Sequence, residues 1–172
     1  MSTIGRDNPP DLAPEHLSAV ALDRAPAEGF EIEDAEIVDV DIAGVEARSG
    51  RIVHARIEGL RAANAMLRDL RLVDVAAEGL DASNGDWRGA TLRRTELRGS
   101  RLTGMALIEA ELEDVLLHDC KLDYANLRGA TLRQVTFSDC VLLDTDFGGA
   151  ALESVRFEGC ALSRAPISAG RR

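Results

Sequence analysis

The sequence is poor in the features that most functional classes require. Aromatic residues make up only 3% of the 172 residues, and the formal net charge is −10. Direct binding to nucleic acid is therefore not expected, because phosphate-binding surfaces are basic and often carry aromatic side chains. No apolar run approaches the ~18 residues of a membrane span, and no basic-then-apolar signal segment opens the chain. These absences favour a cytoplasmic protein without a membrane partner.

Motifs for catalysis and for metal or cofactor binding are also missing. The three histidines, His16, His54 and His118, lie in different segments and show no metal-ligand spacing. No Gly-x-Ser-x-Gly element, phosphate loop or dinucleotide fingerprint occurs. The sequence therefore predicts no catalytic residue, no cofactor and no metal, and a protein that is not an enzyme.

The chain does have an uninterrupted period of five residues. Every fifth residue from Ile32 to Ile167, 28 positions in all, is apolar or alanine. Two residues before each of these central sites lies a second uncharged site, from Phe30 to Ala165. None of these 56 positions is charged, although 50 of the 172 residues are Asp, Glu, Lys or Arg. A helix face repeats every 3.6 residues and a strand face every 2, so neither explains the pattern.

A period of five with two inward sites per repeat requires a chain that turns a corner in every repeat. Four corners close a square, so we expect coils of about twenty residues that stack as a solenoid. The 28 repeats give seven coils. Hydrogen-bonded coils stacked at about 4.8 Å would form a rod on the order of 34 Å long. Glycines such as Gly59 and Gly129, two residues after central sites, fit tight corners with positive φ.

Four segments resemble the pentapeptide repeat family, whose loose motif is a small residue, Asp or Asn, Leu or Phe, a polar residue, and Gly or a polar residue. They are Ala125-Asn126-Leu127-Arg128-Gly129, Ala130-Thr131-Leu132-Arg133, Thr145-Asp146-Phe147-Gly148-Gly149 and Val155-Arg156-Phe157-Glu158-Gly159. The resemblance covers residues 30–169. It implies an all-β fold, a right-handed quadrilateral β-helix of about seven coils.

Residues 1–29 differ from the repeats and are expected to form an N-terminal extension or cap. A short helix over residues 14–21 could cover the open backbone edge of the first coil. Alternatively, apolar residues between 20 and 29 continue the register as an extra half coil. The β-helix itself is expected over residues 30–169, with a tail at 170–172.

Two unusual kinds of inward residue are expected to fill the core. Cys120, Cys140 and Cys160 are twenty residues apart, so they form one inward column with Cα atoms about 5 Å apart. This separation permits disulfides, and stacked thiols could suggest metal. Cys is nevertheless a compact apolar filler, and no His or carboxylate accompanies the column. Trp87 shares its coil with two alanines and a glycine, which indicates volume compensation in a packed layer.

The outward residues make one side of the square strongly acidic. The side with central sites from Ile37 to Phe157 carries eight acids against three arginines, a net charge of −5. We call its carboxylates the acidic wall and treat them as the candidate partner-binding site. They are Glu36, Asp39, Glu58, Glu78, Glu96, Asp119, Asp139 and Glu158. The alternative interpretation is a set of solvated charges that keeps an edge-rich β rod soluble.

The same arrangement stacks arginines in another outward column. Arg48, Arg68, Arg88 and Arg128 recur at a spacing of twenty or its multiples. Like charges stacked at about 5 Å repel one another unless neighbouring acids neutralise them. An interleaved salt-bridge surface is favoured over an anion-binding site.

Some apolar residues are expected outside the core or at the open C-terminal end of the rod. Contacts of this kind mark association, so we expect a two-fold homodimer that stacks C-terminal coils end to end. The candidate contact residues are Leu116, Tyr124, Val141, Leu143, Phe157, Leu162 and Ile167.

The sequence favours a non-enzymatic, rigid scaffold that presents acidic walls to a protein partner of unknown identity. The family resemblance implies a narrower alternative, because some pentapeptide repeat proteins bind DNA gyrase as DNA mimics and some protect it from quinolones. Those proteins usually dimerise through a C-terminal helical segment, whereas here only Ser168 to Arg172 follow the last repeat. Several also carry projecting loops, for which this unbroken register leaves no room.

Overall fold

The computed structural model describes residues 10–11, 18–19 and 28–163. Within these ranges the chain forms strands and turns, and no helix there is long and apolar enough to cross a membrane. The strands are β1 (Ser18–Ala19), β2 (Glu31–Val38), β3 (Glu46–Arg48), β4 (Arg51–Glu58), β5 (Met66–Arg68), β6 (Arg71–Glu78), β7 (Thr91–Arg98), β8 (Glu111–His118), β9 (Thr131–Ser138), β10 (Val141–Leu142), β11 (Ala151–Glu153), β12 (Arg156–Glu158) and β13 (Ala161–Leu162).

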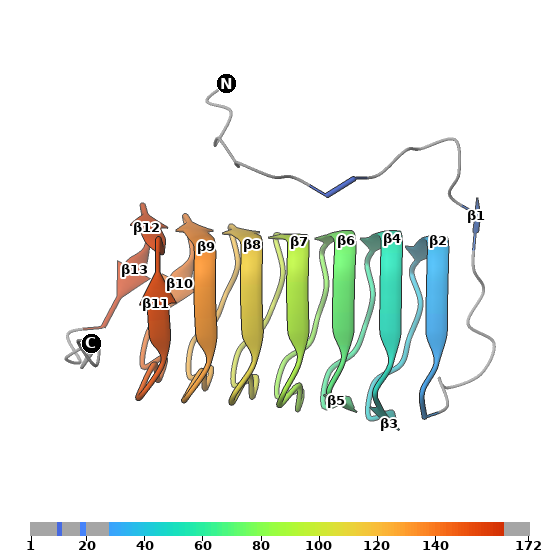
Figure 1. The fold of residues 1–172 in the computed structure, drawn as a ribbon, viewed down its shortest axis with the longest axis horizontal. Helices are drawn as coiled ribbons and strands as arrows, with labels where there is room; N and C mark the ends of the chain where they lie inside the picture. Colours follow the sequence, from blue (N-terminus) through green and yellow to red (C-terminus); the bar gives the residue numbers. More distant parts are fainter. Residues whose placement is uncertain (1–9, 12–17, 20–27, 164–172) are drawn as a thin grey trace.

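The strands stack as the coils of a solenoid of about seven turns (Figure 1). Neighbouring strands are parallel and pair at a register of twenty residues, as Ile32 does with Ile52 and Ile52 with Leu72. The main sheet runs β1-β2-β4-β6-β7-β8-β9-β11, with β12 also pairing with β9. The twenty-residue coil predicted by the period of five and the all-β β-helix implied by the family resemblance are therefore confirmed.

Each long strand turns a corner in its middle. In β2 and β4 the turning residues are Asp34 and His54, with φ of 50° and 49°. We number the sides of the first coil wall 1 (residues 31–33), wall 2 (36–39), wall 3 (41–43) and wall 4 (46–48), and later coils add multiples of twenty. The long strands thus form walls 1 and 2, whereas short pairs such as β3–β5 and single bridges such as Asp41–Arg61 join walls 3 and 4.

The inward columns form one continuous apolar core along the axis. Side chains from Ala35 to Leu142 belong to a single buried cluster, and those of the last coil pack against it more loosely. In the first coil Phe30 enters this core directly beneath Gly50, where a Cβ atom would overlap the phenyl ring. The side-chain size at one inward site is therefore set by the coil stacked on it.

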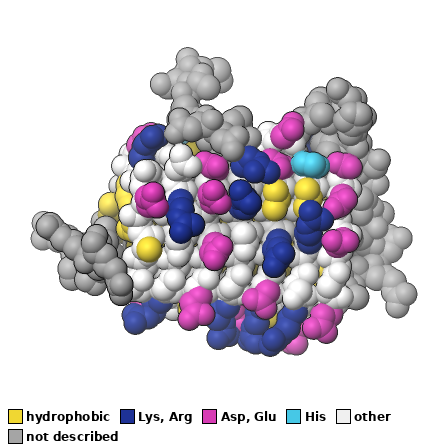
Figure 2. Space-filling view, viewed as in Figure 1, with side chains coloured by type: hydrophobic (Ala, Val, Ile, Leu, Met, Phe, Trp, Pro, Cys, Tyr) yellow, Lys and Arg dark blue, Asp and Glu magenta, His cyan; other side chains and the backbone are white. Residues whose placement is uncertain are grey.

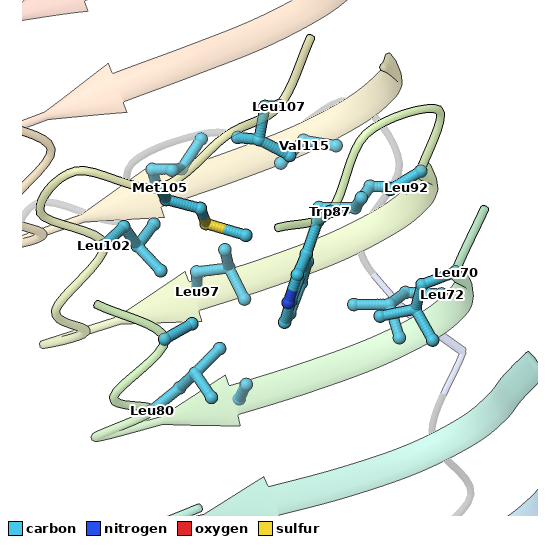
Figure 3. Close-up of a cluster of buried hydrophobic side chains, with 14 of the residues drawn as sticks. Leu70, Leu72, Leu80, Trp87, Leu92, Leu97, Leu102, Met105, Leu107 and Val115 are labelled. Carbon is cyan, nitrogen blue, oxygen red and sulfur yellow. The ribbon is translucent and has the colours of Figure 1, made fainter. Parts of the chain in front are cut away.

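Trp87 lies in this core, as its position in the register predicts. Its side chain is 3% exposed and is flanked by Leu97 on one side and Leu72 on the other (Figure 3). Gly85 gives it room, since a Cβ there would come within 3.4 Å of the indole Nε1 and 3.0 Å of the Ala82 carbonyl oxygen. Small residues around Trp87 thus leave room for the one large ring in this part of the core.

The N-terminal segment meets the solenoid at two described places. Ser18 and Ala19 pair in parallel with Ala35 and Glu36, at the outer edge of β2. The helix expected over residues 14–21 is therefore wrong at Ser18 and Ala19, because the open edge of β2 offers these residues backbone hydrogen bonds. The pairing offset is seventeen residues rather than twenty, so this strand does not continue the register. The remainder of 14–21, and residues 20–27, lie outside the described residues.

Candidate functional site

The acidic wall forms on wall 2, along the second halves of the long strands and the corners that follow them. Six of its eight carboxylate side chains belong to exposed residues, and Glu36 and Glu96 are partly buried. The exposed members are Asp39, Glu58, Glu78, Asp119, Asp139 and Glu158. The structure therefore brings all eight residues onto the same side of the rod, in three adjacent columns.

Few cations of this wall neutralise its carboxylates. Glu58 and Glu78 are in-register neighbours on β4 and β6, and neither takes part in an ion pair among the described residues. Arg98 follows Glu78 in the same column, but its Nε bonds to Glu96 at 3.3 Å. Two like charges about 5 Å apart at a surface repel by on the order of 1 kcal/mol or more. This part of the wall thus holds uncompensated negative charge.

One further contact involves the C-terminal part of the wall. The Asp139 carboxylate accepts a hydrogen bond of 3.2 Å from the Ser138 hydroxyl and lies 3.6 Å from Nδ1 of His118. This histidine is partly buried on β8 and borders the acidic wall.

The other walls carry most of the ion pairs between coils. In the view of Figure 2, acidic and basic side chains are interleaved over the described part of the rod. The pairs on walls 1, 3 and 4 include Arg51–Glu33, Arg61–Asp41, Arg93–Glu113, Arg101–Asp81, Arg128–Asp146 and Arg133–Glu153. Wall 2 differs from them by an in-register pair of carboxylates, Glu58 and Glu78, for which the described residues provide no ion pair.

The arginine column on wall 4 is an ion-pair surface, as the sequence favours. Asp86 lies between Arg68 and Arg88 and accepts hydrogen bonds of 2.8 and 2.7 Å from them. The hydrogen bonds from Arg88, together with those from Arg68, hold the pKa of Asp86 well below its usual range. A surface depression of about 280 Å³ beside Arg48 is also lined by Glu28. Carboxylates that line the same depression would repel a bound anion.

A charged ladder at the corner between walls 1 and 2 was not predicted from the sequence. His54 lies 3.4 Å from Asp34 and 3.6 Å from Asp74, and Arg94 bonds to both oxygens of Asp74 at 2.6 Å. The sequence does contain a signal for this ladder, because its residues recur every twenty positions with alternating charge.

Asp74 is the most enclosed member of this ladder. It is 2% exposed, although its position had suggested a solvated outward charge. Burial opposes its ionisation, but hydrogen bonds from Arg94 and from the Asp11 backbone N–H outweigh burial and lower its pKa. The bond from Asp11 is 3.2 Å long and joins residues 63 positions apart. Asp74 therefore connects the N-terminal segment to the solenoid.

The candidate apolar contacts on the sides of the rod are not one exposed patch. Tyr124 is 66% exposed and Leu143 is 41% exposed, and the Tyr124 N–H donates to the Leu143 carbonyl at 2.9 Å. Val141 is partly buried. Leu116 is 1% exposed, so its prediction as an exposed contact is wrong. It is nevertheless absent from the internal core cluster.

At the C-terminal end, Phe157 stacks on Phe137 with ring centroids 5.0 Å apart, and Phe147 meets both rings edge-on. Phe157 remains partly exposed, and Leu162 is 46% exposed. Ile167 lies outside the described residues. The described end of the rod therefore offers apolar surface from one aromatic layer and one leucine.

The cysteine column lies in the core as a set of free thiols. Cys120 and Cys140 are each 1% exposed, and their Sγ atoms lie 3.3 Å from backbone carbonyl oxygens of the preceding coil. Contact with the Cys120 thiol and burial raise the pKa of Cys140, and burial raises the pKa of Cys160. The same contact lowers the pKa of Cys120, but both thiols of this pair are enclosed in the core, where they pack as compact apolar residues.

The described residues contain no cluster of His, Cys, Asp or Glu suited to a metal ion. A cavity of about 30 Å³ runs through the N-terminal core, between Phe30 and Leu97. It has room for about one water, but water needs two to four polar partners, and its exposed lining is apolar. Trp87 is one of the lining residues, and its Nε1 is buried without a hydrogen-bond partner among the described residues. The arrangement supports recognition by a convex charged surface better than chemistry in a cleft.

Comparison with known proteins agrees with this geometry. A family model described as pentapeptide repeat region matches residues 99–167, and one described as pentapeptide repeats (8 copies) matches residues 71–114. The structure of HetL, a pentapeptide repeat protein involved in heterocyst differentiation regulation from the cyanobacterium Nostoc sp. strain PCC 7120, is similar at 16% identity. It has a TM-score of 0.50 and covers 81% of this chain and 92% of its own.

A second similar structure is full-length QnrB1, a plasmid-mediated fluoroquinolone resistance protein, at 17% identity and a TM-score of 0.43. The match covers 82% of this chain and 93% of that protein. No curated protein matches the sequence. The likeness to HetL, at 16% identity, shows the solenoid fold alone.

Proposed function

The chain belongs to the pentapeptide repeat family, and on that premise we propose that it is a non-enzymatic, rigid scaffold whose acidic wall binds a basic surface of a protein partner. The observation that carries this proposal is the in-register pair Glu58 and Glu78, which has no cation partner among the described residues. Repulsion between these two carboxylates lowers the stability of the free protein, and a basic partner would relieve that repulsion.

The surrounding structure supports the same function. In-register coils hold the carboxylates in straight columns on rigid strands, so little side-chain ordering remains to be done on binding. The ion pairs of walls 1, 3 and 4 reduce the free charge on those sides and so favour wall 2 for recognition by charge. Free thiols at Cys120, Cys140 and Cys160 fit a reducing compartment, and we propose the cytoplasm as the site of action.

Binding of a fluorescent oligoarginine peptide to two charge-matched double variants tests this proposal. Glu58→Gln with Glu78→Gln removes two carboxylates from the acidic wall. The control, Glu33→Gln with Glu113→Gln, removes two carboxylates that pair with arginines on wall 1. We expect the first pair to weaken binding at least fivefold at low salt, and the control to weaken it less than twofold. Equal weakening by both would reject the acidic wall as the site.

Modulation of DNA gyrase as a DNA mimic is the narrower candidate. The observation that favours it is the columnar spacing of uncompensated carboxylates along one side of a narrow rod. A supercoiling assay with added protein tests it directly. No inhibition and no quinolone protection at a large molar excess would reject gyrase while leaving a different basic partner possible.

We also propose a homodimer that stacks C-terminal coils end to end. The partly exposed Phe157 and the exposed Leu162 support it, because apolar groups at an open coil gain by burial. Light scattering is expected to show a dimer that Leu162→Glu weakens. A monomer at tens of micromolar wild-type protein would reject this assembly.

A further inference from the structure

We propose that Cys160 is a redox modification site, at which a peroxide forms a reversible disulfide with Cys140 and so joins the last coil covalently to the coil before it. Both residues are free thiols and lie one coil apart in the inward cysteine column. In a reducing compartment such a disulfide is transient and redox-sensing. This inference concerns inward side chains, so it does not depend on the proposed function, which rests on outward ones.

Backbone pairing holds Cys140 and Cys160 side by side. The residues that follow them, Val141 and Ala161, are an in-register pair, and β12 pairs with β9 just before them. The Ala161 N–H donates to the Cys140 carbonyl oxygen at 2.9 Å. In-register neighbours on parallel strands have Cα atoms about 4.8 Å apart, and disulfides join Cα atoms about 4.4–6.8 Å apart. The register therefore permits the bond.

The sulfur of Cys160 is directed towards the coil that contains Cys140. Its S–H donates to the carbonyl oxygen of Phe137, with 3.3 Å between Sγ and the oxygen. Burial raises the pKa of the Cys160 thiol, and a backbone hydrogen bond from Cys140 partly offsets this rise. The side chain that must react is thus oriented towards its partner before any oxidation.

Exposure distinguishes Cys160 from the other two cysteines. Cys120 and Cys140 are each 1% exposed, whereas Cys160 is only partly buried in the last coil. A thiol must contact the oxidant to be oxidised, so a small peroxide reacts first with Cys160. Cys140 is shielded from the oxidant and serves as the resolving thiol.

The last coil can also make the small movement that the bond requires. A disulfide brings the two Cβ atoms to about 3.5–4.5 Å, closer than the spacing of neighbouring strands. β9 shares three in-register pairs with β11 and three with β12, whereas β8 and β9 share seven. Cys120 and Cys140 lie in coils that are paired on both sides, so the same movement is opposed between those two residues.

The reaction with hydrogen peroxide has two steps. The Cys160 thiolate attacks one peroxide oxygen and the O–O bond breaks, which leaves a sulfenic acid on Cys160 and a hydroxide that takes up the proton released by the thiol. The Cys140 thiolate then attacks Sγ of Cys160, the S–O bond breaks, and the departing hydroxide becomes a second water. Two thiols thus lose two electrons to one peroxide. A thiol reductant reverses the change by disulfide exchange.

Tryptic mapping of the folded, full-length protein after treatment with hydrogen peroxide tests the site. Each cysteine lies in a tryptic peptide of its own. The peptides are 102–121, 134–156 and 157–164. With free thiols alkylated before digestion, we expect a disulfide between the second and third peptides, which dithiothreitol removes, and the first peptide alkylated. In the untreated folded protein, a thiol reagent should modify Cys160 at least tenfold faster than Cys120 or Cys140.

Serine variants provide the matched controls, and unfolding midpoints identify any variant whose solenoid is damaged. Cys160→Ser should leave the two remaining thiols reduced under the same treatment, whereas Cys120→Ser should form the wild-type disulfide. Cys140→Ser should stop the reaction at a sulfenic acid on Cys160, which dimedone labels. A disulfide between Cys120 and Cys140, or no oxidation of Cys160 in the folded wild type, would overturn the proposal.

Hydrogen exchange tests the consequence for the rod. The disulfide would restrain the coil that shares the fewest in-register pairs, so amides of β12 should exchange at least threefold more slowly in the oxidised protein. Reduction should restore the original rate, and amides of β4 and β6, far from the bond, should not change. Unaltered exchange in β12 of the disulfide-bonded protein would overturn the claim that oxidation restrains the last coil.

Discussion

Single residues of this chain are constrained by the residue one coil above or below, and Phe30 with Gly50 shows how tightly. The period of five predicted that both point inward, and both do. It could not predict that the ring of one fills the place of the other's missing side chain, because that depends on ring orientation. Nor could it predict the hydrogen bonds of Asp74, whose partners are Arg94 on the next coil and Asp11, which is distant in sequence.

We predict that Gly50→Ala destabilises the protein by about 1–3 kcal/mol, the usual cost of overpacking a filled core. The new Cβ would overlap the Phe30 ring. Urea unfolding measures the effect, and Phe30→Ala provides the matched background, since the ring is then absent. In that background Gly50→Ala should cost much less. An equal cost in both backgrounds would point to backbone strain instead.

We predict that Asp86→Asn lowers stability at pH 7 by about 1 kcal/mol, a value that allows for solvent screening of the two arginines. The folded pKa of Asp86 is depressed. Its contribution is therefore complete above its unfolded pKa of about 3.9 and declines as pH falls towards the folded pKa. The difference between wild type and variant should shrink below about pH 4. Asp69→Asn, on the same wall and without an ion pair among the described residues, serves as the control.

Among the elements, the long parallel strands provide most of the coil-to-coil pairing. They share seven in-register residue pairs across each of the β2–β4, β4–β6, β6–β7, β7–β8 and β8–β9 contacts. The last coil splits into β11 and β12, with three pairs each to β9. The sequence predicted equal coils because it sees only the period. The last coil pairs less extensively because no further described coil stacks on it.

We predict a gradient of hydrogen exchange along the rod when the protein is dilute enough to remain monomeric. Amides of β7 and β8, paired on both sides, should exchange most slowly, and amides of β11 and β12 should exchange at least tenfold faster. Phe157→Ala should steepen the gradient, because it removes the stacking partner of Phe137. Uniform protection from β7 to β12 would show that the C-terminal coil is covered in solution, as in the proposed dimer.

At the scale of the whole molecule, the period of five predicts the shape of the rod, whereas its function depends on the side chains that the four walls expose. The sequence predicted the solenoid, its seven coils, the buried cysteines and tryptophan, and the side on which the acids gather. It did not predict which carboxylates are neutralised, since ion pairing depends on side-chain reach between coils. Nor could it reveal the buried Leu116, because a residue outward in the register was assumed to face solvent.

The central claim is that the acidic wall is the recognition surface, and mapping a basic probe on the full-length protein by NMR tests it most directly. Oligoarginine titrated into labelled protein should shift the backbone amides of Asp39, Glu58 and Glu78 more than those of the neutralised carboxylates Glu33 and Asp81. Addition of salt should reverse these shifts, because the contact is electrostatic. Shifts of similar size on all four walls would contradict the claim, since the rod would then have no preferred binding side.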